Sequence, residues 1–166
     1  IFKGNMYRYI MLFNSYIFVL LFLPTTILGW FLLNRLINPT WSQLFLLIMS
    51  LWFYGYFNIK YLPIIIISIL VNYSIFRLLS WTSKEKFRVY LLISGMVFNV
   101  GLLFYFKYFD FFLENINYVF HTDFILKRLV LPLGISFFSF QLLSFIIDSY
   151  NGEVPSYRFL SYALFV

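Results

Sequence analysis

The 166-residue chain has no cysteine, a single histidine and very few charged residues. The absence of cysteine excludes disulfide bonds and thiolate chemistry. Lys, Arg, Asp and Glu together make up 11% of the chain, whereas soluble domains carry roughly 25%. Hydrophobic residues make up 63%, and they form several long uncharged runs. This composition predicts an integral membrane protein and excludes an ordinary soluble domain.

The signatures of several enzyme classes are also missing. The sequence has no phosphate-binding loop of the form G-x-x-x-x-G-K or G-x-G-x-x-G, and no G-x-S-x-G nucleophile elbow. Its histidine and carboxylates form no cluster with metal-ligand spacing, so no metal site is predicted. The 12 basic residues outnumber the 6 acidic ones, but they flank the apolar runs. That placement indicates interfacial and loop charge, and no nucleic-acid partner.

His121 is the only side chain that offers a histidine general base. It lies beside Asp123 in a polar joint between two predicted helices. This setting favours an ordinary interfacial histidine over a catalytic one. We therefore predict no catalytic residue within this chain.

The apolar runs predict an all-α, polytopic transmembrane protein in the cell membrane, with about five spans. A sixth run, Phe159–Val166, is too short to cross a bilayer and is interpreted as the start of a further span. The segment Tyr108–Phe120 mixes acidic and amide residues with aromatics, which predicts one amphipathic helix lying in the membrane interface. The five predicted spans are Tyr9–Asn34, Trp41–Phe57, Ile64–Phe76, Val89–Phe106 and Leu129–Ile147.

Four residues predict features within these spans. Pro24 lies in the middle of the first span and predicts a kink. Asn72 lies inside the third span and is expected to hydrogen-bond between helices. Gly95 and Gly101, in the fourth span, are expected to allow close helix contact.

The chain is interpreted as one domain, residues 1–166, because no repeat or long linker divides it. It begins with Ile1 and stops inside an apolar run, so we interpret it as the N-terminal part of a single multi-span domain, truncated at both ends. The 12 basic residues are divided six against six between the two predicted sides, which leaves the orientation undecided. The most basic loop, Arg77–Arg88, favours a cytoplasmic position for that loop.

The run Leu129–Ile147 is 19 residues long and has no formal charge, with Pro132 near its start, where a missing N–H costs little. One side of this predicted helix carries small, polar and finally acidic residues. Lipid offers them no hydrogen-bond partner, so they are expected to face other helices or a wet cavity. Two interpretations stay open, helix packing or the lining of a functional cavity. The residues of this polar stripe are Gly134, Phe137, Gln141, Ser144 and Asp148.

Asp148 stands at the C-terminal end of the predicted helix, where the helix dipole disfavours an acid. We therefore expect it to have a partner. The candidates are a backbone N–H of the turn at Asn151 and Gly152, or a basic side chain from another helix. A solvated loop acid is the alternative.

The segment Pro132–Glu153, PLGISFFSFQLLSFIIDSYNGE, resembles the hallmark segment of the membrane-bound O-acyltransferase (MBOAT) family, in its bacterial alginate O-acetyltransferase-like branch. Phe145 stands where this branch has Tyr, and Ser149 and Asn151 stand where it has Val and Arg. Other parts of the chain are similar to family patterns too, so the resemblance covers nearly all of it. These parts are Ser50–Gly55, the pair Asn72 and Tyr73, and a segment containing Phe106–Tyr108, Asp110–Phe112 and Asn115–Asn117.

The resemblance implies a multi-span helical enzyme that moves an acyl group, acetyl in this branch, from a cytoplasmic thioester donor to a hydroxyl. The implied donor is acetyl-CoA or an acyl carrier thioester, and no cofactor is expected to stay bound. The implied acceptor is an extracytoplasmic polysaccharide or teichoic acid, with extracytoplasmic acetylation proteins and the lipid bilayer as further partners. The family's catalytic histidine lies in a later helix, and no residue here matches it. The chain alone is therefore expected to be inactive.

On physical grounds, Gln141, Ser144 and Asp148 are the candidates for tunnel-lining or core-fixing polar residues. The alternative function is that of a transporter or channel subunit, or of a non-enzymatic membrane scaffold. A transporter is expected to have paired helices broken by glycine or proline in two related halves. The sequence has scattered prolines and no repeated half.

Overall fold

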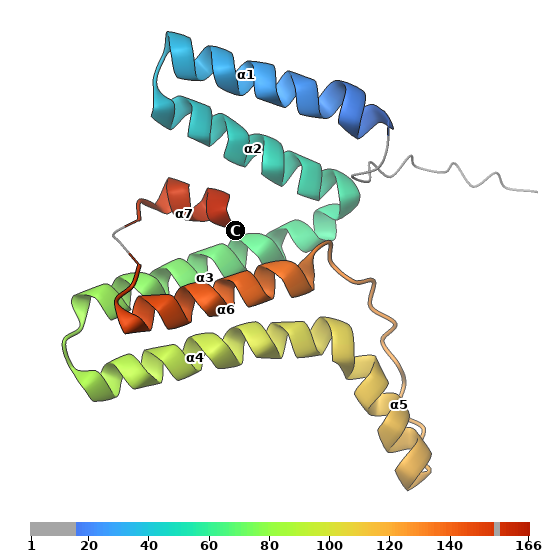
Figure 1. Ribbon diagram of the computed structural model, residues 1–166. Helices are drawn as coiled ribbons and strands as arrows, with labels where there is room; N and C mark the ends of the chain where they lie inside the picture. Colours follow the sequence, from blue (N-terminus) through green and yellow to red (C-terminus); the bar gives the residue numbers. More distant parts are fainter. Residues whose placement is uncertain (1–15, 155–156) are drawn as a thin grey trace, which may run out of the picture. The chain divides into compact units, whose positions relative to one another are not determined.

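The computed structural model describes residues 16–154 and 157–166, and within them the chain is helical, without a strand (Figure 1). It divides into two units, of which the first contains the described residues up to Ile64 together with Arg158–Phe165. The second contains Ile65–Tyr157 and Val166. The predicted all-α membrane fold is confirmed, whereas the number of five spans stays a prediction. Among the described residues, three helical stretches are long and apolar enough to cross a membrane: Phe18–Leu36, Pro39–Trp81 and Glu85–Phe120.

The first unit consists of a helical hairpin and a short C-terminal helix. Pro39 opens the second helix of the hairpin after the extended residue Asn38, because a missing N–H costs little at the first helical position. Gly29 lets the two helices approach, since a Cβ atom there would lie 2.7 Å from Cζ of Phe45. The elements of this unit are the π-helical turn η1 (Phe18–Phe22), α1 (Leu23–Leu36), α2 (Pro39–Asn58), the 3-10 turn η2 (Ile59–Tyr61) and α7 (Phe159–Phe165).

The first helix is irregular where Pro24 predicts a kink. The π-helical turn Phe18–Phe22 stands directly before α1, and Pro24 has no N–H to donate to an earlier carbonyl. The hydroxyl of Thr26 donates to the carbonyl of Phe22 at 2.7 Å. The start of the predicted span Tyr9–Asn34, up to residue 15, lies outside the described residues.

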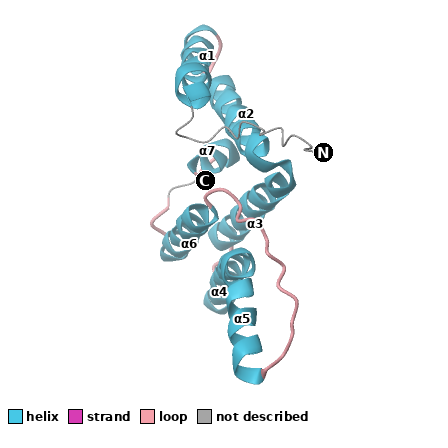
Figure 2. Cartoon of the chain, turned by 90° about the vertical axis from the view of Figure 1, so that its right-hand side faces the viewer, coloured by secondary structure: helices cyan, strands magenta, loops and turns pink. Residues whose placement is uncertain are grey.

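The second unit packs three long helices side by side (Figures 1 and 2). Contacts along their length show that α4 runs antiparallel to both of its neighbours. Asn72 of α3 is paired with Asn99 of α4, while the later residue Ile75 of α3 lies by the earlier residue Gly95 of α4. Arg88 at the start of α4 contacts Tyr150 at the end of α6. The elements of this unit are α3 (Leu62–Trp81, from Ile65 on), α4 (Glu85–Leu103), the π-helical turn η3 (Phe104–Tyr108), α5 (Phe109–Phe120) and α6 (Ile135–Asn151).

The buried residues of α4 follow one another at intervals of one helical turn, and each defines one level, or layer, of the core of the second unit. At Gly95 both neighbouring helices approach, because a Cβ atom there would lie 2.6 Å from Cδ1 of Ile146 and 3.4 Å from Cδ1 of Ile75. The predicted close contact at Gly95 is confirmed. The same prediction for Gly101 is wrong, since no described atom lies within 4 Å of its Cβ position. The buried residues of α4, four apart on one helix face, are Leu91, Gly95, Asn99 and Leu103.

Asn72 and Asn99 form a reciprocal amide pair in the next layer. The Nδ2 atom of Asn72 donates to Oδ1 of Asn99 at 3.2 Å, and Nδ2 of Asn99 donates to Oδ1 of Asn72 at 2.7 Å. The same nitrogen atoms also donate to the carbonyls of Ser68 and Gly95, each at 2.8 Å. All four amide hydrogens are therefore used in a site that solvent hardly reaches. The predicted interhelical bond of Asn72 is confirmed.

α4 continues through η3 into α5, and Figure 1 shows the chain bending there. The loop that follows α5 is tied to it by two side chains. Oδ1 of Asn117 accepts the backbone N–H of Phe124, and Oδ1 of Asp110 accepts that of Lys127, both at 2.9 Å. The helix predicted for Tyr108–Phe120 is confirmed, while its place in the membrane interface stays a prediction.

Candidate functional site

The helix α6 carries most of the predicted hallmark segment, but it begins later than the apolar run Leu129–Ile147. The carbonyl of Pro132 accepts the N–H of Ile135 at 3.3 Å in a turn, and Gly134 has a φ of 67°, a conformation that favours glycine. The prediction of a helix from Leu129 with Pro132 in its first turn is therefore wrong. Proline disfavours helical geometry at the residue before it, so the helix starts only after this turn.

The C-terminal end of α6 extends beyond the predicted one, to Asn151, so that Asp148 lies inside the last turn. Gly152 ends the helix with a φ of 80°. The N–H of Glu153 donates to the backbone carbonyl of Asp148 at 3.0 Å, and this bond closes the helix. The resulting helix has 17 residues, or about 25 Å of length.

The buried face of α6 fixes its rotation about its own axis. Leu142 and Ile146 are fully buried, and Ile146 reaches Gly95 of α4. The rings of Phe145 and Phe76 of α3 lie 5.2 Å apart between centroids. Because these residues point into the second unit, the residues on the other side of α6 point away from it.

Arg88, in the first turn of α4, holds the end of α6. Its guanidinium donates to the carbonyl of Tyr150 and lies 5.5 Å from the centroid of the Tyr150 ring. A positive charge at the C-terminal carbonyls of a helix is stabilising, by about 0.3–1 kcal/mol at an exposed site. The sequence places Arg88 among the loop charges, and no local motif distinguishes it from them.

Lys107 contacts the opposite, N-terminal end of α6 through a side chain, so this contact gains nothing from the helix dipole. Its Nζ atom lies 3.3 Å from Oγ of Ser136 in the first turn of α6. This contact links η3 to the start of the helix. Arg88 and Lys107 thus contact the two ends of α6. Neither contact could be predicted from the spacing of residues in the sequence.

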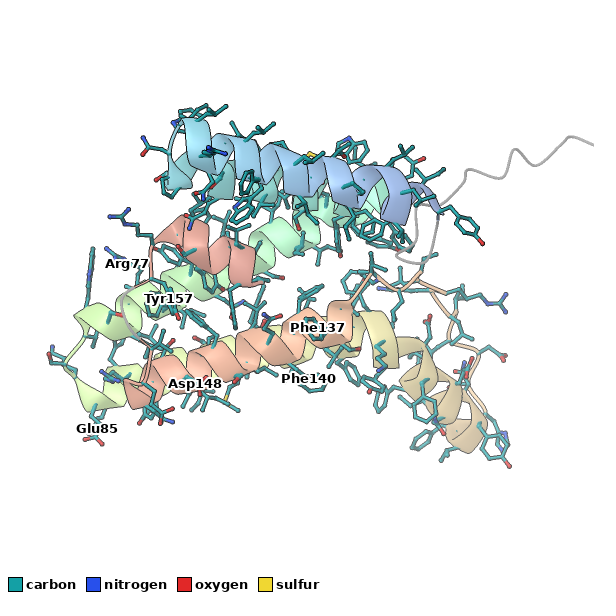
Figure 3. All side chains as sticks on the ribbon, turned by 45° about the horizontal axis from the view of Figure 1, so that its top comes forward. Arg77, Glu85, Phe137, Phe140, Asp148 and Tyr157 are labelled. Carbon is teal, nitrogen blue, oxygen red and sulfur yellow. The ribbon has the colours of Figure 1, made fainter. Side chains whose placement is uncertain are left out.

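The polar stripe lies on the side of α6 away from its fully buried residues, and this side is only partly exposed, since Oε1 of Gln141 is buried. Ser144 and Phe137 are exposed, and Gln141 and Asp148 are half-buried. Figure 3 labels Phe137 and Asp148 among the α6 side chains. Gly134 precedes the helix as its N-cap, so its place on the helical stripe is not confirmed.

Asp148 has a partner within the stripe. Oγ of Ser144, one turn earlier, lies 3.3 Å from Oδ2 of Asp148 and donates to it. Neither predicted kind of partner, a backbone N–H of the following turn or a basic side chain from another helix, bonds to Asp148 among the described residues. The N–H groups of Gly152 and Glu153 donate to the backbone carbonyls of Ser149 and Asp148 instead. The structure therefore brings Ser144 and Asp148 together, and Gln141 lies on the same side two turns before Asp148.

His121 lies far along the chain from this stripe, at the C-terminal end of α5. It is exposed, and it caps α5 in the left-handed conformation with a φ of 50°. The absence of a catalytic role for His121 stays a prediction.

Comparisons with known proteins identify bacterial homologues over most of the chain. A peptidoglycan O-acetyltransferase of Helicobacter pylori is 40% identical over 144 residues, which are 86% of this chain and 27% of that protein. A probable alginate O-acetylase AlgI of Pseudomonas aeruginosa is 33% identical over 162 residues, which are 94% of this chain and 30% of that protein. The corresponding protein of Azotobacter vinelandii is 33% identical over 94% of this chain and 32% of its own length.

The chain spans about a third or less of the length of these relatives. No family model matches the chain, and no solved structure matches it. The relatives confirm the resemblance to the membrane-bound O-acyltransferases that the hallmark segment indicates.

Proposed function

We propose that this chain, a homologue of bacterial membrane-bound O-acyltransferases, is part of a membrane enzyme that O-acylates an extracytoplasmic polymer. The single observation that carries the proposal is the 40% identity over 86% of the chain to a peptidoglycan O-acetyltransferase. The transferred group in this proposal is acetyl, as in the names of the relatives. The donor is a cytoplasmic thioester, acetyl-CoA or an acyl carrier thioester. The acceptor is a hydroxyl of a polysaccharide or of another cell-wall polymer such as teichoic acid.

The chemistry requires a base that takes the proton of the acceptor hydroxyl as the acyl carbon is attacked. We assign no such base within this chain. His121, the only histidine, is exposed at the end of α5, and no described side chain is shown bonded to its imidazole. The contribution of this chain is therefore to build part of the wall along which donor and acceptor meet.

In this proposal, α6 is the part of the wall that carries Gln141, Ser144 and Asp148. Asp148 lies in the last turn of α6, and a carboxylate that faces lipid without a polar partner is disfavoured. The half-buried Asp148 and exposed Ser144 share one hydrogen bond, and they lie on the side of α6 away from its fully buried residues. Water, polar substrate or polar groups of the full-length protein are therefore expected on this side, in preference to lipid.

A transfer assay with the full-length protein in vesicles tests the proposal. Labelled acetyl-CoA is added on one side of the membrane, and an acetyl-free polysaccharide is enclosed on the other. We expect alkali-labile acetyl groups on the polysaccharide, with no label on it in vesicles without protein. Uptake of free labelled solute without ester formation would favour a transporter and would contradict the proposal.

A further inference from the structure

Two serines in the core of the second unit, Ser68 of α3 and Ser139 of α6, differ from the other helical serines around them. Both are almost completely buried, with 1% and 0% of their surface exposed. Neither hydroxyl has a hydrogen-bond partner among the described residues. A buried hydroxyl without a partner is strongly disfavoured, and more so in a protein surrounded by lipid.

Serine in a helix ordinarily satisfies its hydroxyl on its own backbone, by donating to a carbonyl three or four residues earlier. Four serines of this unit do so. The acceptors are the carbonyls of Leu70, Phe76, Leu91 and Phe145 for Ser74, Ser80, Ser94 and Ser149, respectively. The hydroxyls of Ser68 and Ser139 do not make this bond to a carbonyl of their own helix.

The packing of the three helices places these two serines at the same level. Ile75 and Ile146 meet at Gly95, where both reach the position of a Cβ atom on the glycine. Ser68 lies seven residues before Ile75, and Ser139 lies seven residues before Ile146. Seven residues are almost two full turns, so each serine lies on the same face of its helix as the isoleucine, about 10.5 Å along the axis.

Ser68 and Ser139 are displaced from the two isoleucines in the same direction, because α3 and α6 run parallel to each other. α3 and α6 both run antiparallel to α4, because Asn72 pairs with Asn99 and Arg88 contacts Tyr150. α3 and α6 therefore run parallel to each other. Going from Ile75 and Ile146 toward the N-terminal ends of α3 and α6, one passes the level of the Asn72–Asn99 pair and then reaches Ser68 and Ser139.

The Asn72–Asn99 amide pair lies one helical turn away from Ser68 and is its polar neighbour in the core. Nδ2 of Asn72 donates to the backbone carbonyl of Ser68 at 2.8 Å, so Ser68 is already tied to the layer of Asn72 and Asn99. All four amide hydrogens of that pair are used, which leaves none for the serine hydroxyls. The partner of these hydroxyls has to be small and able both to donate and to accept.

We propose that Ser68 and Ser139 bind one water molecule between α3 and α6, one turn away from the Asn72–Asn99 pair. Water fits because buried waters bridge polar groups that the protein leaves unsatisfied. Each hydroxyl both donates and accepts, so the water has at least two polar partners. This bound water extends the polar part of the core from one layer to two and joins α6 to the α3–α4 pair.

A set of alanine variants of the full-length protein in detergent tests the site. Removal of one hydroxyl weakens the water site and strands the other hydroxyl, so we expect Ser68→Ala and Ser139→Ala each to lower the melting temperature by a few degrees. Once the water is lost, the second substitution should lower the melting temperature by little more. The loss in the double variant should therefore be clearly smaller than the sum of the two single losses. Ser149→Ala is the matched control, because its hydroxyl is satisfied on its own helix, and it should combine additively with Ser68→Ala.

Two results would overturn the proposal. If either single variant melts higher than the unsubstituted protein, the hydroxyl is an unpaired group whose removal is favourable. Additive losses would show that the two hydroxyls share no ligand. An experimental density map of the unsubstituted protein is the second measurement, and it should show a water within hydrogen-bond distance of both Oγ atoms. A direct bond between the two hydroxyls in that map would refute the water site.

Discussion

The contact at Gly95 predicts a mutational effect that can be worked out atom by atom. In the variant Gly95→Ala, the new Cβ atom would lie 2.6 Å from Cδ1 of Ile146 and 3.3 Å from its Cγ2 atom. Real Cβ atoms essentially never come as close to another heavy atom as the first of these distances. α6 or the Ile146 side chain therefore has to move. Because Cδ1 is the far end of a flexible side chain, we expect part of this clash to be relieved by rotation of that side chain.

Two energetic effects of opposite sign determine how much Gly95→Ala changes the free energy of unfolding. Overpacking a core costs about 1–3 kcal/mol. Replacing glycine by alanine within a helix returns about 1 kcal/mol. We expect Gly95→Ala to destabilise the second unit by the difference, about 0–2 kcal/mol.

Ile146→Val supplies the compensating change, because valine lacks the Cδ1 atom that clashes. Alone it costs about 0.5–1.5 kcal/mol. In the double variant with Gly95→Ala, we expect the two losses to be less than additive, since the new methyl group occupies the space that Cδ1 leaves. Gly101→Ala is the control, because nothing lies within 4 Å of its Cβ position, and it should be neutral or stabilising.

The assay is thermal unfolding of the full-length protein in detergent for the four variants and the unsubstituted protein. A loss for Gly101→Ala as large as that for Gly95→Ala would show that helix propensity and local geometry, and not the α6 contact, decide the outcome. Full additivity of Gly95→Ala and Ile146→Val would equally refute the proposed contact.

Three further predictions concern the membrane position and the chemistry. Cysteines replacing Phe111 and Tyr118, exposed by 65% and 83%, should react with an impermeant reagent from the same side of the membrane if α5 lies in the interface; reaction from opposite sides would mean that it crosses. The chain alone should transfer no acetyl group from acetyl-CoA to polysaccharide, and transfer that His121→Ala abolishes would show that the chemistry is misassigned. Asp148→Ala should reduce folded yield or acyl transfer more than Glu153→Ala, because Asp148 is hydrogen-bonded to the stripe and Glu153 is exposed; equal behaviour close to that of the unsubstituted protein would mean that Asp148 is merely solvated.

Hydrophobic runs predict the helices of this chain well, because burying apolar length within lipid is the dominant constraint on a membrane protein. Asn72 illustrates a correct residue-level prediction, since an amide inside an apolar span has few options other than another helix. The identity of its partner, Asn99, was not predicted. It depends on the register between α3 and α4, which no local pattern encodes.

The errors have local physical causes. The apolar run from Leu129 reads as helix, but Pro132 and the positive φ of Gly134 turn the backbone before α6 begins. Gly101 reads as a contact glycine, yet it lies off the face of α4 defined by the buried residues Gly95 and Asn99. Residue type alone cannot show which face of a uniformly apolar helix is packed.

The sequence predicts which polar residues share one side of α6, but it does not predict their contacts. Helical spacing places Gln141, Ser144 and Asp148 on that side, away from the fully buried residues of α6, while their role in a functional site stays a prediction. The bond between Ser144 and Asp148 is not one of the two bonds that the sequence predicts for Asp148, to a backbone N–H of the following turn or to a basic side chain from another helix. The anchoring by Arg88 depends on tertiary packing and has no sequence signature.

The polar side of α6 is the central element of the proposed function, and a comparison of two leucine variants tests it most directly. Gln141→Leu removes a polar group from the stripe, whereas Phe140→Leu changes an exposed apolar residue one turn before Ser144 and leaves every polar group of the stripe in place. Acetyl transfer from labelled acetyl-CoA to polysaccharide is measured with the full-length protein, per mole of folded enzyme. We predict that Gln141→Leu loses most of the transfer rate per mole of folded enzyme, while Phe140→Leu retains it. Equal rates for the two variants and the unsubstituted protein would contradict the assignment of this side to the reaction path.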